Sequence, residues 1–526
     1  MKKTNIKAFI LGAFAAVTLT ACTDGYLGFN TNPYEVTGEE MKRDGYLVRS
    51  ALTGMQGWVI PTDVNCNQFT ESLVGGPLSG YLAESNQGFG NRFSNFNQSN
   101  SWNRVFYKDI IPNIYSNLTQ LKAVTDDEVF LSVGNIVKVA AIMRVTDTYG
   151  PIPYTKLGAD GSLTAPLDAQ QTVYKAMVQE LDDAVNALLP HITESFTATA
   201  DKVYEGNVAK WIKLANSYKL RLGMRAVYAD PTWAQQVCES AVAPTNGGVL
   251  ESNADNAAIG GITNNPFRVV MYEYNGGDAR IGADIVCLMN GYNDPRRAAM
   301  FTKSTFSDAS ITNNYYGIRI GTDPIPSDLA HCYSNMVVAS TSSIVWMTSA
   351  EVQLLMAEGA LRGWSMGGTA ADFYAKGVAL SFEQWGVSGA DAYLADNTSM
   401  PQLYVDPLGT YSYNGVQPTI TVAFDPSADF ETNLERIVTQ KYIAMFPNGN
   451  EAWAEFRRTG YPRLMPVAVN KNVAQVPQGE FARRLWYPQE EYKDNGPNVA
   501  AAIADLTPQV DLMSSRMWWD CNPRTK

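Results

Sequence analysis

The sequence predicts a mostly α-helical body whose helices pack in pairs, with long loop-rich inserted regions and few short strands. Two observations lead to this fold class. Apolar residues recur at three- and four-residue spacing in several segments, and these segments begin at capping residues and end at glycine or proline. Between them lie stretches rich in Gly, Asn, Pro and Tyr that lack helical period, at about 57–101, 230–345 and 387–430.

The clearest helix is predicted over 133–148. One buried stripe along it is formed by Val133, Ile136, Val137, Ala140 and Met143. Gly150 suits the position after a helix end, and Pro151 cannot extend the helix. Asp147 lies in the last turn, where the helix dipole disfavours an anion, so we expect a cationic partner, with Arg144 the nearest candidate.

Further helices are predicted from caps and apolar periodicity along the chain. Four of them cover about 38–56, 102–122, 348–363 and 369–386. Another is opened by a capping box Asp168-x-x-Gln171 and closed by Pro190, and one is opened by Thr432-x-x-Glu435. Of the remaining two, one begins at about Asn207 and the other, a short one, surrounds Trp453. The short loop after 363 makes its two helices antiparallel. Helix pairs of this length, with small residues such as Gly359 at crossing points, resemble degenerate tetratricopeptide units. The tryptophans on helical stripes, Trp211, Trp385 and Trp453, are expected in the core.

The N-terminal segment has the pattern of a secretory signal. Residues 1–21 place Lys2, Lys3 and Lys7 before an apolar run, and Leu19-Thr20-Ala21-Cys22 resembles a bacterial lipobox. We therefore expect cleavage before Cys22, lipidation of that cysteine, a tether over 22–37 and a single body over 38–526. The alternative is an ordinary signal peptide followed by a chance cysteine.

Composition excludes several kinds of partner and chemistry. The net charge is −12, and removal of the three signal lysines leaves 37 basic against 52 acidic side chains, a net charge of −15. Nucleic acid and anionic lipid would repel such a chain. Two histidines make a histidine triad or a multi-histidine metal site improbable. The remaining cysteines form no metal-ligand pattern and are expected to be scattered buried thiols with at most one bridge: Cys66, Cys238, Cys287, Cys332 and Cys521.

No sequence motif marks an enzyme. There is no G-x-S-x-G, no P-loop and no G-x-G-x-x-G after a strand. A glycosidase needs only two suitably spaced carboxylates, so this alternative stays open, although Glu351 and Glu435 are better explained as caps. No cofactor is expected; Asn253-Ala254-Asp255-Asn256 could supply calcium oxygens but lacks EF-hand spacing.

The informative chemistry is aromatic rings interleaved with amides inside predicted loops. An aromatic face contacts the apolar face of a sugar, and amides, carboxylates and guanidinium groups bind its hydroxyls. The alternative is that the rings fill small loop cores, and Trp102 could equally anchor its helix. The candidate ligand-binding residues are Phe89, Arg92, Phe93, Phe96, Asn97 and Trp102, then Tyr272, Tyr274, Asn275 and Asp278, and finally Tyr315 and Tyr316.

Several further motifs follow the lipobox along the chain. In order they are MRVTDTYGPIPY (143–154), WIKLANSYKLRLGMR (211–225), TSAEVQLLMAEGALRGW (348–364), TQKYIAMFPNGNEAWAEFRRTGYPRL (439–464), RRLWYPQEEYKDN (483–495) and MWWD (517–520). Together with the lipobox, and in this order, they resemble the SusD/RagB family of outer-membrane lipoproteins of Bacteroidetes.

The resemblance implies about four tetratricopeptide-like helix pairs beside a looped ligand-binding region. It also implies a lipid-anchored protein at the cell surface that binds glycans, or in some members peptides, and has no catalysis of its own. Such a protein would pass its ligand to a SusC-like TonB-dependent barrel in the outer membrane. The glycan-contacting loops vary among members, so the candidate residues rest on the loop chemistry alone.

Overall fold

The computed structural model describes residues 45–157, 164–416 and 418–525, and a compact unit extends over Val48–Lys526. The predicted signal peptide, the tether and Cys22 lie outside the described residues. The mostly helical class with helix pairs is confirmed. The longer helices are α9 (Ile110–Val124), α10 (Glu128–Tyr149), α11 (Gln170–Leu188), α12 (Val208–Arg225), α13 (Pro231–Ala241), α18 (Ser349–Leu361), α19 (Ala370–Gln384), α21 (Phe430–Ala444) and α22 (Gly449–Thr459).

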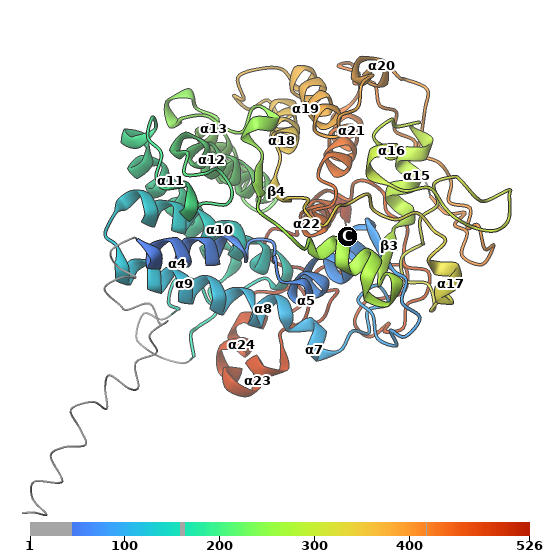
Figure 1. Ribbon diagram of the computed structural model, residues 1–526, viewed down its shortest axis with the longest axis horizontal. Helices are drawn as coiled ribbons and strands as arrows, with labels where there is room; N and C mark the ends of the chain where they lie inside the picture. The colour runs from blue at the N-terminus through green and yellow to red at the C-terminus, as the bar shows by residue number, and fades with distance from the viewer. Residues whose placement is uncertain (1–44, 158–163, 417, 526) are drawn as a thin grey trace, which may run out of the picture. The chain divides into compact units, whose positions relative to one another are not determined.

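These helices pack mainly against their neighbours in the chain, as in a solenoid of helix pairs. The helices α9 to α13 pack in succession, and α18 packs against α19, with α21 contacting both (Figure 1). The early and late groups meet where α12 packs against α18. At the α18–α19 crossing, a Cβ on Gly377 would lie 2.6 Å from Leu354 Cγ, so the absence of a side chain there permits the close approach.

Helix α10 is more deeply buried than its predicted single stripe implied. From Val133 to Tyr149 all residues except Asn135 are buried, because other helices cover it on several sides. It begins one turn earlier than predicted, since the carboxylate of Asp127 accepts a hydrogen bond from Val129 N at 2.8 Å. Among the described residues α10 alone is long and apolar enough to cross a membrane, and its apolar window is 83% buried inside the protein, as in a core helix.

Two predicted capping boxes are wrong. The side chain of Asp168 accepts hydrogen bonds from Thr155 N at 2.7 Å and from Thr155 Oγ1, and α11 begins only at Gln170. Helix α21 begins earlier than predicted, because Asp429 accepts from Thr432 N at 3.0 Å and takes the N-cap position. The cap at Thr348 is confirmed, with Glu351 N donating to its Oγ1 at 3.1 Å.

The expected extent of some elements is also corrected. The single helix predicted over 102–122 is three consecutive helices, α7 (Asn100–Asn103), α8 (Val105–Lys108) and α9. The segment from 230 is not irregular at its start, because α13 packs against α12 as a full helix. Its signal was present in the sequence: Asp230 accepts from Trp233 N as the N-cap, and Pro231 occupies the first turn.

The other helical elements lie in the inserted regions, between the longer helices and near the ends of the described chain. The α-helices are α4 (Tyr46–Gln56), α5 (Val64–Asn67), α6 (Gly76–Ser79), α14 (Pro266–Arg268), α15 (Ala283–Gly291), α16 (Arg297–Met300), α17 (Ser327–Ala330), α20 (Ala390–Leu394), α23 (Gln489–Asp494) and α24 (Gly496–Ile503). The π-helices are η1 (Gln68–Gly75) and η6 (Val269–Glu273), and the 3₁₀ turns are η2 (Leu189–His191), η3 (Ala198–Ala200), η4 (Pro244–Asn246), η5 (Asn253–Asp255), η7 (Tyr274–Gly276) and η8 (Pro523–Thr525).

Within the described residues the short strands form two antiparallel pairs. Strand β1 (Leu82–Glu84) pairs with β3 (Ala279–Ile281), with Leu82 opposite Ile281. Strand β2 (Ala257–Ile259) pairs with β4 (Ile344–Met347), with Ile259 opposite Ile344. The β1–β3 pair joins the first inserted region to the second, although about two hundred residues separate them in sequence.

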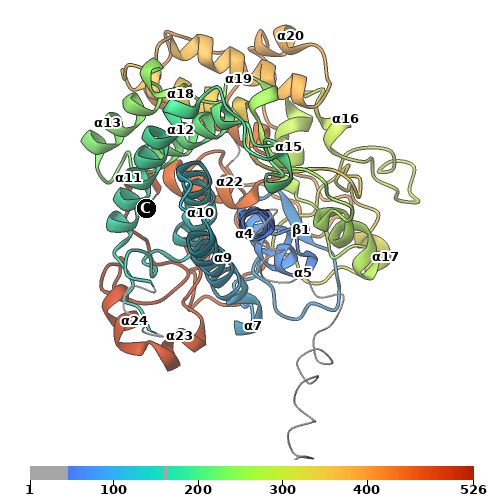
Figure 2. The ribbon, with the colours of Figure 1, turned by 60° about the vertical axis from the view of Figure 1, so that its left-hand side comes forward.

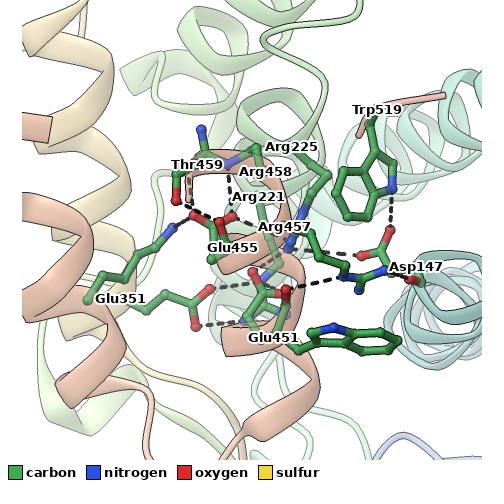
Figure 3. A network of polar contacts seen from close by, with 12 residues as sticks. Asp147, Arg221, Arg225, Glu351, Glu451, Glu455, Arg457, Arg458, Thr459 and Trp519 are labelled. Atoms are coloured by element: carbon green, nitrogen blue, oxygen red, sulfur yellow. Dashed lines mark hydrogen bonds and ion pairs between the residues drawn. The ribbon is translucent and has the colours of Figure 1, made fainter. Parts of the chain in front are cut away.

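A buried network of ion pairs connects the scaffold helices (Figure 3). Arg221 donates from Nε and Nη2 to the Glu351 carboxylate at 2.8 and 2.7 Å, which joins α12 to α18. Arg458 of α22 donates to both oxygens of Glu358 of α18 at 2.6 Å. Because a buried charge without a partner is costly, these pairs fix how the helices lie against one another. Glu351 therefore serves in an ion pair rather than merely as a cap residue.

Asp147 has a cationic partner as predicted, but this partner is Arg225 and not Arg144. Its carboxylate accepts from Trp519 Nε1 at 3.0 Å and from the Tyr174 hydroxyl, and Arg225 lies at 3.9 Å (Figure 3). Arg144 instead donates to the buried carboxylate of Glu71. Burial raises the pKa of Asp147, and Arg225 and Tyr174 oppose that rise.

Among the described residues the five cysteines are free thiols, so the single bridge left open above is not formed. Cys66, Cys238 and Cys287 are buried, as expected, but Cys332 is partly exposed and Cys521 is exposed. Burial raises the pKa of the three buried thiols, so they are held in the unreactive protonated form.

Candidate ligand-binding surface

A buried carboxylate brings two of the three predicted aromatic stretches together. Asp278, which is 2% exposed, accepts hydrogen bonds from Gln68 Nε2 at 2.6 Å, Asn86 Nδ2 at 2.7 Å and Asn275 Nδ2 at 2.9 Å. The adjoining backbone adds a bond from Ser85 N to Asp278 O at 2.9 Å. We call Asp278 and its three donors the Asp278 junction. It holds the loop after β1, the loop before β3 and the start of η1 in one place.

Aromatic rings lie next to the first of these loops. Trp102 packs edge-to-face with Phe89 at a centroid distance of 5.0 Å and contacts Phe69 at 4.9 Å. These three rings are partly buried, so each leaves some of its surface open to solvent. Phe69, which follows Gln68 directly in η1, was not among the candidate residues predicted from the sequence. Nothing in the sequence indicated that η1 approaches this loop.

The second loop presents tyrosines beside an arginine and an amide. The guanidinium of Arg268 lies 3.9 Å from the ring centroid of Tyr272, and the Tyr272 hydroxyl donates to Met336 O. The Tyr274 hydroxyl donates to Asn65 Oδ1 at 3.3 Å. Asn65 is in α5, which is directly followed by η1 and its first residue Gln68, so Tyr274 lies close to the Asp278 junction.

Asn275 is exposed on this loop and adopts a left-handed conformation with φ of 54°. Asparagine tolerates this conformation better than most side chains. We define the aromatic loop surface as Phe89, Trp102, Tyr272, Tyr274 and Asn275. Its rings and amides are the groups that bind the apolar face and the hydroxyls of a sugar.

Four candidate residues do not face outward as expected. Phe93 and Phe96 are 0% and 1% exposed and belong to the core. Arg92 is 2% exposed and donates to the carbonyl oxygens of Phe89, Asn86 and Thr322, at 3.1, 3.1 and 3.4 Å. Asp278 is the buried acceptor of the junction. These side chains hold the loop frame in place. Their burial could not be foreseen, because Thr322, Gln68 and Asn86 lie far away in sequence from the side chains that they bind.

The remaining candidates divide in the same way. Asn97 is partly buried, and its Oδ1 accepts from Arg92 N at 3.1 Å, which closes the loop on itself. Tyr315 lies under the guanidinium of Arg297 at 4.7 Å, and Tyr316 packs against Phe306 at 6.5 Å. Both tyrosines are partly exposed, but no contact within the described residues joins them to the Asp278 junction.

A cavity of about 190 Å³ shares its walls with the segments that carry this surface. Phe267 and Asn265 line it just before Arg268, and Glu71 lines it from η1. Trp385 also lines it and is partly exposed, whereas a core position was expected. Its Nε1 is buried and has no hydrogen-bond partner among the described residues.

Asp255 and Asn253, which belong to the segment considered for calcium binding, have structural roles. The Asp255 carboxylate accepts from Glu251 N at 3.1 Å and from Lys213 Nζ at 3.2 Å. Asn253 donates to Leu380 O at 3.0 Å. Within the described ranges no group of three or more His, Cys, Asp or Glu side chains could hold a metal ion.

Helix pairs with irregular insertions that carry aromatic rings and amides define a helical scaffold protein whose loops bear the candidate surface. The family model for the SusD-like family, described as "Susd and RagB outer membrane lipoprotein", matches residues 28–520. The chain belongs to this family. No curated protein sequence matches it.

Solved structures agree with this assignment. A SusD homolog from Bacteroides uniformis has 45% identity and a TM-score of 0.87, with 91% of this chain and 100% of that chain covered. A susD homolog from Bacteroides thetaiotaomicron has 40% identity and a TM-score of 0.85, covering 90% and 99%. A chitin-binding SusD homolog from Flavobacterium johnsoniae has 35% identity and a TM-score of 0.83, also covering 90% and 99%.

Proposed function

We propose that this protein is a cell-surface lipoprotein that captures oligo- or polysaccharide and delivers it to a SusC-like TonB-dependent transporter in the outer membrane. Lipidation of Cys22 would anchor it there, and it performs no catalysis of its own. The observation that carries the proposal is the aromatic loop surface, whose partly exposed rings and exposed amide lie on, or pack against, the loops that the Asp278 junction joins. The chitin-binding relative from Flavobacterium johnsoniae supports a glycan as ligand.

Binding would draw on two kinds of contact. The rings of Phe89 and Trp102 offer dispersion and C–H···π contact to the apolar face of a pyranose. Asn275 and the Tyr274 hydroxyl offer donors and acceptors to its hydroxyl groups. The charged side chains described above are already bound to other groups of the protein and are not free to pair with a ligand. The surface therefore recognises a neutral sugar better than a strongly charged ligand.

Calorimetry of the mature protein against a panel of neutral oligosaccharides tests this proposal. We expect Trp102→Ala and Tyr274→Ala each to weaken binding about fivefold, because each removes a ring contact or a hydroxyl worth about 1 kcal/mol. Tm should change little, since both side chains are partly exposed. Tyr46→Ala, which removes a 48% exposed ring elsewhere, is the matched control.

Other outcomes decide against parts of the proposal. Binding to peptides and to no glycan would favour the peptide-binding alternative. Release of shorter sugars from a bound polysaccharide would show a glycosidase. A collapse of Tm in Trp102→Ala would show that this ring belongs to the core. Membrane fractionation of Cys22→Ala, and co-purification with a transporter encoded beside it, test the anchor and the delivery step.

A further inference from the structure

A cavity beside the C-terminal segment has features of a binding site. A cavity of about 510 Å³ lies between the start of α11 and the chain that follows α24, which are on the same side of the body (Figure 2). This volume is within the range of small-molecule sites. Its walls come from Pro151, from 169–171 and from the C-terminal residues 505–521. None of the residues of the aromatic loop surface lines it.

One wall of this C-terminal cavity is a tryptophan held in a fixed orientation. Trp518 is partly exposed and packs edge-to-face against Tyr174 of α11 at a centroid distance of 5.5 Å. Trp233 of α13 packs against it at 6.4 Å. The neighbouring Trp519 is buried in the ion-pair network. Since Trp518 is restrained from two sides, its ring forms a pre-organised platform on which a sugar can pack.

The wall of the cavity includes polar side chains that have no partner within the described part of the chain. Within the described residues the side chains of Gln171, Asp505 and Thr507 make no hydrogen bond or ion pair. An amide, a carboxylate and a hydroxyl are the donors and acceptors that bind vicinal sugar hydroxyls. Arg516 is the nearest cation on the wall, and its guanidinium is already held by Asp520 at 3.3 Å.

A buried acceptor in the wall lacks a donor. Gln170 is 1% exposed, and its Nε2 donates to Thr146 O at 2.9 Å. Its Oε1 has no hydrogen-bond partner among the described residues. Buried polar atoms are nearly always paired, so this oxygen indicates that a water or a ligand hydroxyl completes the wall.

We propose that the C-terminal cavity is a second glycan subsite, which takes one or two rings of a neutral oligosaccharide. This inference depends on the proposed function for the class of ligand, but not on the aromatic loop surface. Trp518 packs against the apolar face of the sugar, while Gln171, Asp505 and Thr507 bind its hydroxyls. An acidic sugar is disfavoured, because Asp505 is unpaired and Arg516 is already neutralised by Asp520.

The test is calorimetry of the mature protein with chito-, cello-, malto-, xylo- and manno-oligosaccharides. We expect Trp518→Ala to remove one of two binding events, or to weaken binding about tenfold or more. Trp518→Phe, which keeps a flat ring, should restore part of the loss. Circular dichroism reports whether the variant is folded.

A second variant keeps the inference testable if Trp518→Ala unfolds. Gln171→Ala combined with Asp505→Ala removes only side chains without partners, so the fold should be unchanged and binding should weaken. Asp126→Ala, an exposed carboxylate with no side-chain partner, is the matched control.

The results separate the two proposals. Unchanged binding in the Gln171/Asp505 variant and in folded Trp518 variants, together with loss in Tyr274→Ala, would overturn the second subsite and leave the proposed function intact. Absence of binding to every sugar by the unaltered protein would overturn the proposed function, and the subsite with it.

Discussion

The Glu358–Arg458 ion pair allows a quantitative prediction of stability. Both side chains are 0% exposed, and the guanidinium donates to both carboxylate oxygens at 2.6 Å. Burial alone would raise the pKa of Glu358, but Arg458 and Arg362 outweigh it and lower the pKa from 4.5 to about 2. Lowering a carboxyl pKa by this amount corresponds to about 3 kcal/mol of folding free energy.

We therefore expect Glu358→Gln to lower the free energy of unfolding by about 3 kcal/mol at pH 7. This agrees with the roughly 3–5 kcal/mol lost when one partner of a buried ion pair is removed. The loss should lie at the low end, because Arg458 keeps Glu455 as a partner at 2.6 Å. Urea unfolding followed by circular dichroism measures the difference, and Glu480→Gln, at an exposed position, is the control.

The pH dependence of this difference has a definite sign. The folded pKa lies below the unfolded one, so the stabilisation by Glu358 is complete above pH 4.5 and is lost as the pH falls toward about 2. The gap between the two proteins should stay constant from pH 7 to about 5 and narrow at lower pH. A difference below about 1 kcal/mol at pH 7, or a gap that widens on acidification, would refute this reasoning.

Two further substitutions address the scaffold and the loop surface. Gly377→Ala should destabilise the protein by about 1–3 kcal/mol, because the new methyl group would lie 2.6 Å from Leu354 Cγ. Urea unfolding measures this loss. Lys376→Ala, on the exposed face of the same helix, is the control and should have little effect. Asp278→Ala should speed hydrogen exchange in both loops of the Asp278 junction and weaken glycan binding, because three amide donors lose their acceptor. Unchanged exchange in these loops would contradict the role given to this carboxylate.

Much of the scaffold could be predicted because its signals are local. Thr348 and Thr369 cap α18 and α19 with their own side chains, and the glycines and prolines that end the helices act on their own backbone. The errors arose where a second side chain competed for the same role. Asp429 occupies the N-cap position that was expected for Thr432, and the carboxylate of Asp168 accepts a hydrogen bond from Thr155 N instead of capping α11.

The binding surface was less predictable because burial depends on partners far away in sequence. The aromatic and amide composition singled out three loops without indicating how they are placed, and the Asp278 junction joins two of the three. It could not indicate that Arg92 would be enclosed by carbonyl groups from both sides, one of them Thr322. Nor did helical spacing reveal that Trp385 borders a cavity.

The Asp278 junction separates the parts of the loops that carry the architecture from the parts that can change. Its donors Gln68 and Asn86 are buried or partly buried, whereas Phe89 and Tyr274 lie on the same loops with partly exposed rings and take no part in it. Substitution of Phe89 or Tyr274 would thus alter which molecule is recognised, while the backbone conformation of the loops is preserved. The same property gives protein engineers a defined place to install new specificities without redesigning the helical frame.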